Sequence, residues 1–302
     1  FFFKTKNISL FYYGHWMGLA FCAAKLAAVY NLANHYSLEI VQSYLSVMSC
    51  FMFPMGIIGA RTMSWVLEDN FSISKLFRPG FWWHGGLAGV IAGIILGTWW
   101  QKLHVIPLLD AFGFAMPAFE IFNRLGCLSY GCCWGKVAPK TYPYAIRFHC
   151  KDSCIHRNSA DCKNDWLYPA QLYASLLSFG QFVAIGSLYH KIDIPTGILF
   201  LLGSATSSLV RMFCEQYRGD FRGSGVISTQ VFAVLQMLSA FCIIICCPQR
   251  ELYQANAFQV GSSISRNTSA YHIVEHVVMS SSLNFLATYA IAFFAYGTHM
   301  HP

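Results

Sequence analysis

Long apolar segments alternate with short polar ones along most of this chain. A transmembrane helix needs about 20 mainly apolar residues, and seven segments meet that measure, near 9–31, 43–67, 81–100, 105–124, 168–190, 195–217 and 226–247. An eighth segment, 283–297, is short and flanked by serines, which leaves open whether it spans the membrane or lies at the interface. The pattern predicts an all-α polytopic membrane protein with about seven transmembrane helices.

The segments divide into one membrane domain and a tail. We expect a transmembrane domain over 1–247, with the polar stretch 136–167 as a small extramembrane arm or head between spans four and five, and a C-terminal tail over 248–302. Loops longer than about 15 residues are usually functional or disordered, so a solvated connector is the alternative interpretation of this stretch. The composition agrees with a membrane protein, because 56% of the 302 residues are hydrophobic and 11% are charged, against about a quarter charged in soluble domains.

The placement of charge leaves the orientation open. The net charge is +7, and with seven spans most basic residues fall on the side of the N-terminus and the long polar loop, which the positive-inside rule makes cytoplasmic. Cys150, Cys154 and Cys162 lie in the same loop, and cysteine pairs in loops are typical of an oxidising compartment. One of the three pairs elsewhere or stays free. A zinc site with His149 or His156 is the competing interpretation, although its spacing fits no common zinc pattern.

Ionisable residues inside or at the edges of the apolar segments mark a candidate site. A charge at the membrane centre costs at least about 2.5 kcal/mol on insertion scales. The residues concerned are Arg61, His84, Asp110, Glu120, Arg124, Arg211, Glu215 and Arg218. Arg211 and Glu215 share one helix face and can neutralise each other. The set still contains more arginines than acidic residues, and an arginine binds phosphate through two parallel hydrogen bonds. Lys25, within the first span, is interpreted as a lysine that snorkels to the interface.

One stretch, Phe122–Gly135, combines a charge with glycines and cysteines in the order F-N-R-L-G-C-L-S-Y-G-C-C-W-G. Its glycines let the backbone come close to a bound group. Its cysteines, at 127, 132 and 133, have a plain interpretation as small apolar filler or as partners of loop cysteines. The alternative is a thiol nucleophile that forms a covalent lipid intermediate, since a thiolate beside Arg124 is electrostatically favoured.

Five short motifs, taken in order, resemble the prolipoprotein diacylglyceryl transferase family between about Trp16 and Phe232. Gly59-Ala60-Arg61 resembles the family's G-A/G-R, and His84-Gly85-Gly86-Leu87 resembles its H-G-G-L/I. Its signature D…R-x-G-N-x-x-x-G-E-x-x-G is matched by Asp110 with Arg124, Gly126, Gly131 and Gly135. The segment from Pro169 to Tyr173 resembles its H-P-x-Q-L-Y-E, and its R-x-x-x-E-x-x-R-x-x-D is matched by Arg211, Glu215, Arg218 and Asp220.

The chain also departs from the family pattern. Cys127 stands where the family has Asn, Cys132 where it has an acid, Tyr168 where it has His and Ala174 where it has Glu. Two further family tyrosines are replaced by Met17 and Ser207. The departures favour a related phospholipid chemistry more firmly than the same acceptor.

The resemblance implies a seven-helix enzyme of the bacterial inner membrane, with the N-terminus outward and the active site open to lipid and to the periplasmic side. It implies transfer of diacylglyceryl from phosphatidylglycerol to the lipobox cysteine thiol of a prolipoprotein, without metal, cofactor or nucleic acid, by a monomer. The excess of basic residues then attracts anionic lipid. The alternatives are the same scaffold with a glycan or small-molecule acceptor, and a non-catalytic lipid-binding membrane protein.

The same resemblance assigns roles to individual residues. Arg124 and Arg211 are expected to clamp the phosphate, because preorganised charges stabilise a transition state that gathers charge on its oxygens. His84 is expected to orient the headgroup or take the proton of the acceptor, and Glu215 to hold Arg211. The expected substrate-binding residues are Arg61, Gly85, Gly86, Gly126, Cys127, Gly131, Cys132, Gly135, Gln171, Tyr173, Glu215 and Arg218.

Overall fold

The computed structural model describes residues 3–4, 8–10, 12–67, 83–151, 153–158, 165–220, 238 and 266–300. This part of the chain is almost entirely helical. Its longer helices are α1 (Tyr12–Ala33), α2 (Leu38–Val47), α3 (Phe53–Leu67), α4 (Trp83–Trp100), α5 (Val105–Tyr130), α7 (Ala170–Lys191), α8 (Ile198–Glu215), α11 (Arg266–Ser280) and α12 (Ser282–Gly297). A π-helical segment, η1 (Met48–Met52), joins α2 to α3, and α6 (Cys154–Asn158) is short.

Five of the described helices are long and apolar enough to cross a membrane, namely Tyr12–Ala33, Leu38–Met63, Val105–Tyr130, Ala170–Lys191 and Ile198–Glu215. A sixth results if the pair Ala270–Ser280 and Ser282–Phe294, bent by 65°, counts as one span. The prediction of an all-α polytopic membrane protein is confirmed, while the count of seven stays a prediction. The expected span 226–247 lies outside the described residues, apart from Leu238.

A small antiparallel sheet, which the hydrophobic pattern did not predict, joins the two ends of the described chain. Its strands are β1 (Phe3–Lys4), β2 (Ile8–Leu10) and β3 (Thr298–Met300), in the order β1-β2-β3. The pairing of β2 with β3 places Ile8 opposite Met300. The start of the chain is therefore held beside the end of α12.

α4, which corresponds to the third expected span near 81–100, packs on α3 and η1 through a row of glycines. Gly85, Gly89 and Gly93 recur every fourth residue and so lie on one face of the helix. A Cβ atom on Gly89 would lie 2.1 Å from the carbonyl oxygen of Met55. Small residues allow this close approach of backbones in a membrane, where van der Waals packing drives helix association.

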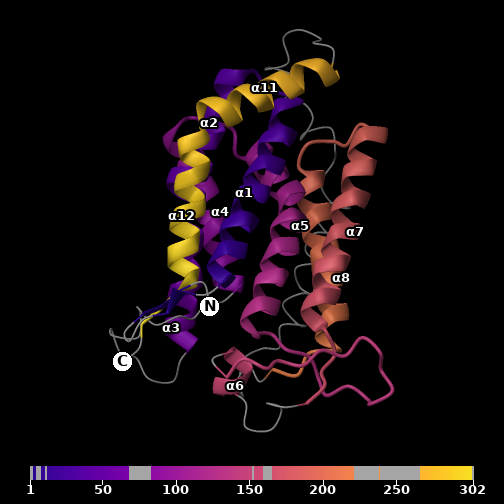
Figure 1. Ribbon diagram of the computed structural model, residues 1–302. Coiled ribbons are helices and arrows are strands. Elements are labelled where there is room, and N and C mark those ends of the chain that lie inside the picture. Colours follow the sequence, from indigo (N-terminus) through magenta and orange to yellow (C-terminus); the bar gives the residue numbers. More distant parts are fainter. Residues whose placement is uncertain are drawn as a thin grey trace.

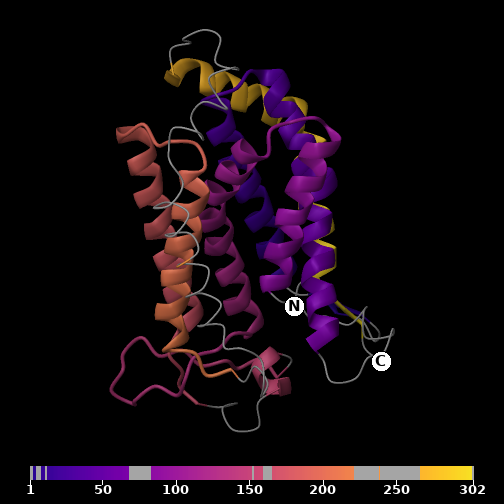
Figure 2. The ribbon, with the colours of Figure 1, turned by 180° about the vertical axis from the view of Figure 1, so that it is seen from behind.

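α5 lies at the centre of the bundle, where it contacts α1, α4, α7 and α8 (Figures 1 and 2). Near its start, the Asp110 carboxylate accepts hydrogen bonds from the backbone N–H groups of Gly197 at 2.6 Å and Phe200 at 2.9 Å. A carboxylate at a helix N-terminus satisfies donors that have no partner within the helix. Asp110, a candidate site residue in the sequence, therefore fixes α8 beside α5.

The described residues between α5 and α7 form a head at one end of the bundle, opposite the end that α11 crosses (Figure 1). Leu167 bridges to Val137 and Ile146, and its side chain packs with those of Trp134 and Ile155. Cys150, one of the three cysteines of this loop, carries a free thiol, and a disulfide staple through the other two stays a prediction. Cys162 lies outside the described residues.

The C-terminal helix α12 packs along α1 rather than lying flat at an interface (Figure 1). Lys25 of α1 holds it there. The Lys25 side chain is 5% exposed, and its Nζ donates to Oγ of Ser49 at 3.1 Å, to Oδ1 of Asn284 at 2.8 Å and to the hydroxyl of Thr288. The prediction that Lys25 snorkels is wrong, because the side chain is buried and bonded inside the bundle. Two of its three partners, Asn284 and Thr288, come from a tail that the sequence motifs do not cover.

Candidate active site

A cavity of about 520 Å³ lies inside the helix bundle. Along most of its length its walls are apolar side chains of α1, η1, α4 and α5, among them Phe21, Met52, Val90, Phe112 and Met116. Near the head, the lining becomes polar and cationic, with His84, Asn123, Arg124, Arg211, Arg218 and Asp220. The cavity therefore matches a ligand with a long apolar part and an anionic end.

A second, smaller cavity adjoins the cationic end on the side of α7. Trp83, Arg124, Cys133, Arg211 and Arg218 line both cavities, so the three arginines stand at the boundary between them. The smaller cavity adds polar groups from α5, α7 and α8, including Glu120, Gln171, Gln181 and Glu215. A phosphate at this boundary would be within reach of guanidinium groups from two different helices.

Arg124 is 9% exposed and is held by an acid of its own helix. Its Nε donates to Oε2 of Glu120, one turn earlier on α5, at 2.8 Å. The amide of Asn123 donates to the same oxygen at 3.4 Å. Oε1 of Glu120 is buried and has no hydrogen-bond partner among the described residues. The bond orients the guanidinium and leaves its two Nη groups for an oxyanion.

Arg218 follows α8 and forms a two-pronged ion pair with Asp220. Its Nε donates to Oδ1 at 2.9 Å and its Nη2 to Oδ2 at 2.7 Å, while Glu215 lies at 4.0 Å. The backbone here is tied to the loop after α5, because Gly219 N donates to the Trp134 carbonyl at 3.0 Å. These bonds bring residues from the ends of α5 and α8 to one place.

Arg211 and His84 complete the cationic end. The Arg211 guanidinium lies 5.2 Å from the centre of the Trp83 ring, a cation–π geometry that orients the charge. His84 follows Trp83 at the start of α4 and lines the larger cavity. The structure therefore brings together the three residues expected to be catalytic, from α4, α5 and α8.

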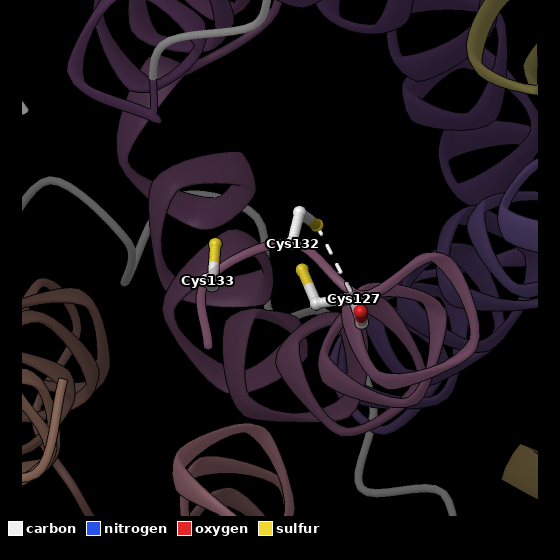
Figure 3. A group of neighbouring side chains, drawn as sticks. All are labelled: Cys127, Cys132 and Cys133. Atoms are coloured by element: carbon white, nitrogen blue, oxygen red, sulfur yellow. Dashed lines mark hydrogen bonds between the residues drawn. The ribbon is translucent and has the colours of Figure 1, made fainter. Parts of the chain in front are cut away.

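Three cysteines converge beside these arginines (Figure 3). The sulfur atoms of Cys127, Cys132 and Cys133 lie within 4.8 Å of one another, and all three thiols are free. Hydrogen bonds from Cys127 and Cys132 hold the pKa of the Cys133 thiol well below its usual value, and Arg218 and Arg124 act in the same direction. The same bonds raise the pKa of Cys132, with burial adding to the effect.

Several residues expected to bind substrate make packing contacts within the protein. A Cβ on Gly85 would lie 2.3 Å from Cβ of Met63, whereas Gly86 lines the larger cavity. Gly126 lies against Tyr13 and Trp16 of α1, Gly135 against the backbone of Tyr168, and Gly131, with φ of 73°, ends α5. Arg61 and Tyr173 line neither cavity, and Tyr173 shares a hydrogen bond with Tyr142. Gln171 and Glu215 line the smaller cavity, as Cys127 lines the larger.

Gln181 and Tyr296 are lining residues that the sequence did not identify. Gln181 is buried in the middle of α7, where its Nε2 donates to Thr206 at 2.7 Å and Ser207 at 2.9 Å. A polar amide side chain in the middle of an apolar span was the sequence signal that could have identified Gln181. Tyr296 reaches the larger cavity from α12, and no motif pointed to it.

The fold and the cavity define a polytopic membrane protein with an internal chamber that is apolar along its length and cationic near the head. Residues 1–248 match the Prolipoprotein diacylglyceryl transferase family, and the chain belongs to this transferase family. The matched segment ends before α11 and α12 begin.

Curated relatives agree at low identity. The chain is 28% identical over 244 residues to phosphatidylglycerol–prolipoprotein diacylglyceryl transferase 2 of Clostridium perfringens, covering 77% of this chain and 88% of the relative. It is also 28% identical over 197 residues to the phosphatidylglycerol–prolipoprotein diacylglyceryl transferase of Clostridium tetani, covering 63% and 73%. A relative of the same name from Zymomonas mobilis is 29% identical over 261 residues, covering 79% and 85%.

Proposed function

We propose that this protein transfers a diacylglyceryl group from phosphatidylglycerol to the thiol of a prolipoprotein cysteine. The observation that carries the proposal is the cavity of about 520 Å³ whose apolar length ends at three arginines. The apolar lining suits acyl chains, and the cationic end suits a phosphate. Membership of the family and the names of the relatives support the same reaction.

The arginines act on the leaving group. The sulfur of the acceptor attacks the glyceryl carbon next to the phosphate, the C–O bond breaks, and glycerol phosphate leaves with the electron pair. Arg124 and Arg211 bind the phosphate oxygens as these oxygens gain negative charge. A preorganised hydrogen-bond donor stabilises such a transition state most strongly where water is excluded. Glu120 fixes Arg124 at 2.8 Å, so little reorganisation is needed during the step.

His84 serves the acceptor side. It lies at the start of α4 and lines the same cavity as Arg124 and Arg211, and a neutral imidazole has a ring nitrogen that accepts a proton. It therefore takes the thiol proton or orients the glyceryl headgroup. Arg218, Gln171 and Glu215 shape the surroundings of the phosphate, and Arg61 contacts lipid outside the cavity.

The proposed setting is the bacterial inner membrane. The protein is a multi-pass monomer there, with its head and the cationic end of the cavity toward the periplasm. The phospholipid enters from the membrane and the prolipoprotein signal peptide brings its cysteine from the same side. Accessibility of Cys150, an exposed thiol in the head, to a membrane-impermeant reagent in intact cells tests this orientation.

Transfer from labelled phosphatidylglycerol tests the reaction. Membranes that contain the protein receive the lipid and a lipobox peptide, and mass spectrometry follows the peptide. We expect a diacylglyceryl thioether with the normal protein and a loss of at least about 100-fold with Arg124→Ala or Arg211→Ala, the size typical for removal of one preorganised charge donor. Lys191→Ala, a change at the end of α7, is the matched control. Undiminished transfer in either arginine variant would refute the clamp.

A different acceptor on the same scaffold is the second candidate. The family has polar residues at four positions that this chain fills with Cys127, Cys132, Tyr168 and Ala174. This change in the residues around the site favours a different acceptor. Turnover of phosphatidylglycerol in a membrane extract without lipidation of the lipobox peptide, with a lipidated glycan or small molecule as product, would select this candidate.

A further inference from the structure

The cysteine cluster has the geometry of a thiolate metal site. Cys127 lies near the end of α5, and Cys132 and Cys133 follow in the next loop, with all three sulfur atoms within 4.8 Å of one another (Figure 3). A tetrahedral zinc ion with Zn–S bonds of about 2.3 Å holds its sulfur ligands roughly 3.8 Å apart. Small side-chain rotations close the difference.

The backbone holds this arrangement in place. Gly131 and Cys132 donate their N–H groups to the Cys127 carbonyl at 2.9 and 3.2 Å, which turns the chain back over the end of α5. Cys133 then has φ of 54°, a left-handed conformation that is strained for a residue with a side chain. The buried Gln171 fixes the loop, because its Nε2 donates to the Cys132 carbonyl at 2.8 Å. The strained loop thus places the third sulfur beside the other two.

The charges around the cluster suit thiolates. Arg124 and Arg218 line the cavity that Cys127 and Cys133 also line, and their acidic partners Glu120 and Asp220 are engaged in ion pairs with them. Three thiolates around a divalent ion carry one net negative charge, which neighbouring guanidiniums favour. Soft sulfur ligands select zinc or another thiophilic ion over magnesium or calcium.

A role for one of these thiols as the nucleophile that attacks the lipid is less consistent with repeated turnover than a metal site is. Attack by Cys133 on the lipid would form a thioether, and a thioether is a poor leaving group for a second transfer. A cluster that holds a metal avoids this end point, because the metal keeps the three sulfur atoms coordinated. In a catalytic zinc site, three protein ligands leave a fourth position for water or substrate.

We propose that Cys127, Cys132 and Cys133 bind a zinc ion whose fourth coordination position opens to the cationic end of the cavity and receives the acceptor thiol as a thiolate. This inference rests on the proposed function. The acceptor thiol gives its proton to His84, which lines the same cavity, as its sulfur binds the ion. The sulfur then forms a bond to the glyceryl carbon, and the C–O bond breaks with the electron pair leaving on glycerol phosphate. No group is oxidised or reduced. The thioether product is a weaker ligand than a thiolate, so it leaves the metal.

Metal content tests the site without any need for turnover. The protein is purified in detergent under reducing conditions, loaded with zinc, dialysed and measured by elemental mass spectrometry. We expect about one zinc per chain, a loss of it in Cys132→Ser and in Cys133→Ser, and its retention in Cys22→Ser and Cys150→Ser, which change free thiols outside the cluster. Cys132→His keeps a ligand and is expected to keep the metal, which separates loss of a ligand from loss of the fold. Protein without zinc after loading, or equal zinc in all variants, overturns the site.

Cobalt reports on the fourth position. Protein loaded with Co²⁺ is expected to show thiolate-to-cobalt charge-transfer absorption that rises when a lipobox peptide is added and stays unchanged with the Cys→Ser peptide. An unchanged spectrum with both peptides overturns the acceptor role. If zinc binds and the spectrum responds while no lipid is transferred, the proposed function fails and the site stands. If metal-free protein transfers lipid at the full rate, the proposed function stands and the role of zinc fails.

Discussion

The carboxylate of Glu120 accepts a hydrogen bond of 2.8 Å from Nε of Arg124, one helical turn further along α5. Both side chains are buried within the bundle. This pair explains how an arginine is kept at the end of an apolar chamber. The acid offsets the charge of the guanidinium and sets its direction, while the Nη groups stay available to a phosphate.

Removal of one partner from this pair should destabilise the protein. Arg124→Ala leaves Glu120 as a buried charge without its partner, and breaking a buried pair costs about 3–5 kcal/mol. The double variant Glu120→Gln with Arg124→Gln should recover most of that stability and still lack transfer activity. Thermal unfolding in detergent, together with transfer from labelled phosphatidylglycerol, separates the two effects. Full activity in the double variant would show that the charge has no part in the reaction.

The contact between α5 and α8 depends on Asp110. Asp110→Ala removes the acceptor for the N–H groups of Gly197 and Phe200, and leaving buried donors unsatisfied costs about 1–3 kcal/mol. Asp110→Asn keeps one oxygen and should lose less. We expect a lower unfolding temperature with near-normal transfer per folded molecule. A stable but inactive Asp110→Ala protein would instead give Asp110 a role in the chemistry.

Two adjacent glycines at the start of α4 should respond differently to the same change. In Gly85→Ala the new Cβ would lie 2.3 Å from Cβ of Met63, while in Gly86→Ala the nearest atom, Cβ of Ala60, is 3.5 Å away. Overpacking costs about 1–3 kcal/mol, so Gly85→Ala should lower yield and unfolding temperature. Gly86→Ala should fold normally. Equal stability of the two variants would contradict the close packing of α4 on α3.

The C-terminal helix should loosen when Lys25 is replaced. Lys25→Met removes the donor to Ser49, Asn284 and Thr288, and the buried oxygens left behind destabilise the contact by about 1–3 kcal/mol. Hydrogen exchange in α12 should rise while exchange in α7 stays unchanged. Lys191→Met, at the end of α7, is the control. Unchanged protection of α12 would mean that apolar packing alone holds it on α1.

The sequence predicted the fold class and most of the cationic site, because an apolar run of about 20 residues and a charge within it each have few structural solutions. Arg124, Arg211 and His84, which the family resemblance grouped together, line one cavity. The partners of Lys25 lie far away in the chain, and no local pattern reports such contacts. The glycines at 85, 126 and 135 illustrate the same limit, since a motif does not distinguish a glycine that contacts a ligand from one that packs against another part of the chain.

The most direct test of the account is transfer by the purified protein from phosphatidylglycerol labelled in its acyl chains to a lipobox peptide. We expect a peptide that gains one diacylglyceryl group on its cysteine, release of glycerol phosphate in equal amount, and loss of both products in Arg211→Ala. Lipid binding without turnover, both with the peptide and with a membrane extract, would contradict the proposed transfer.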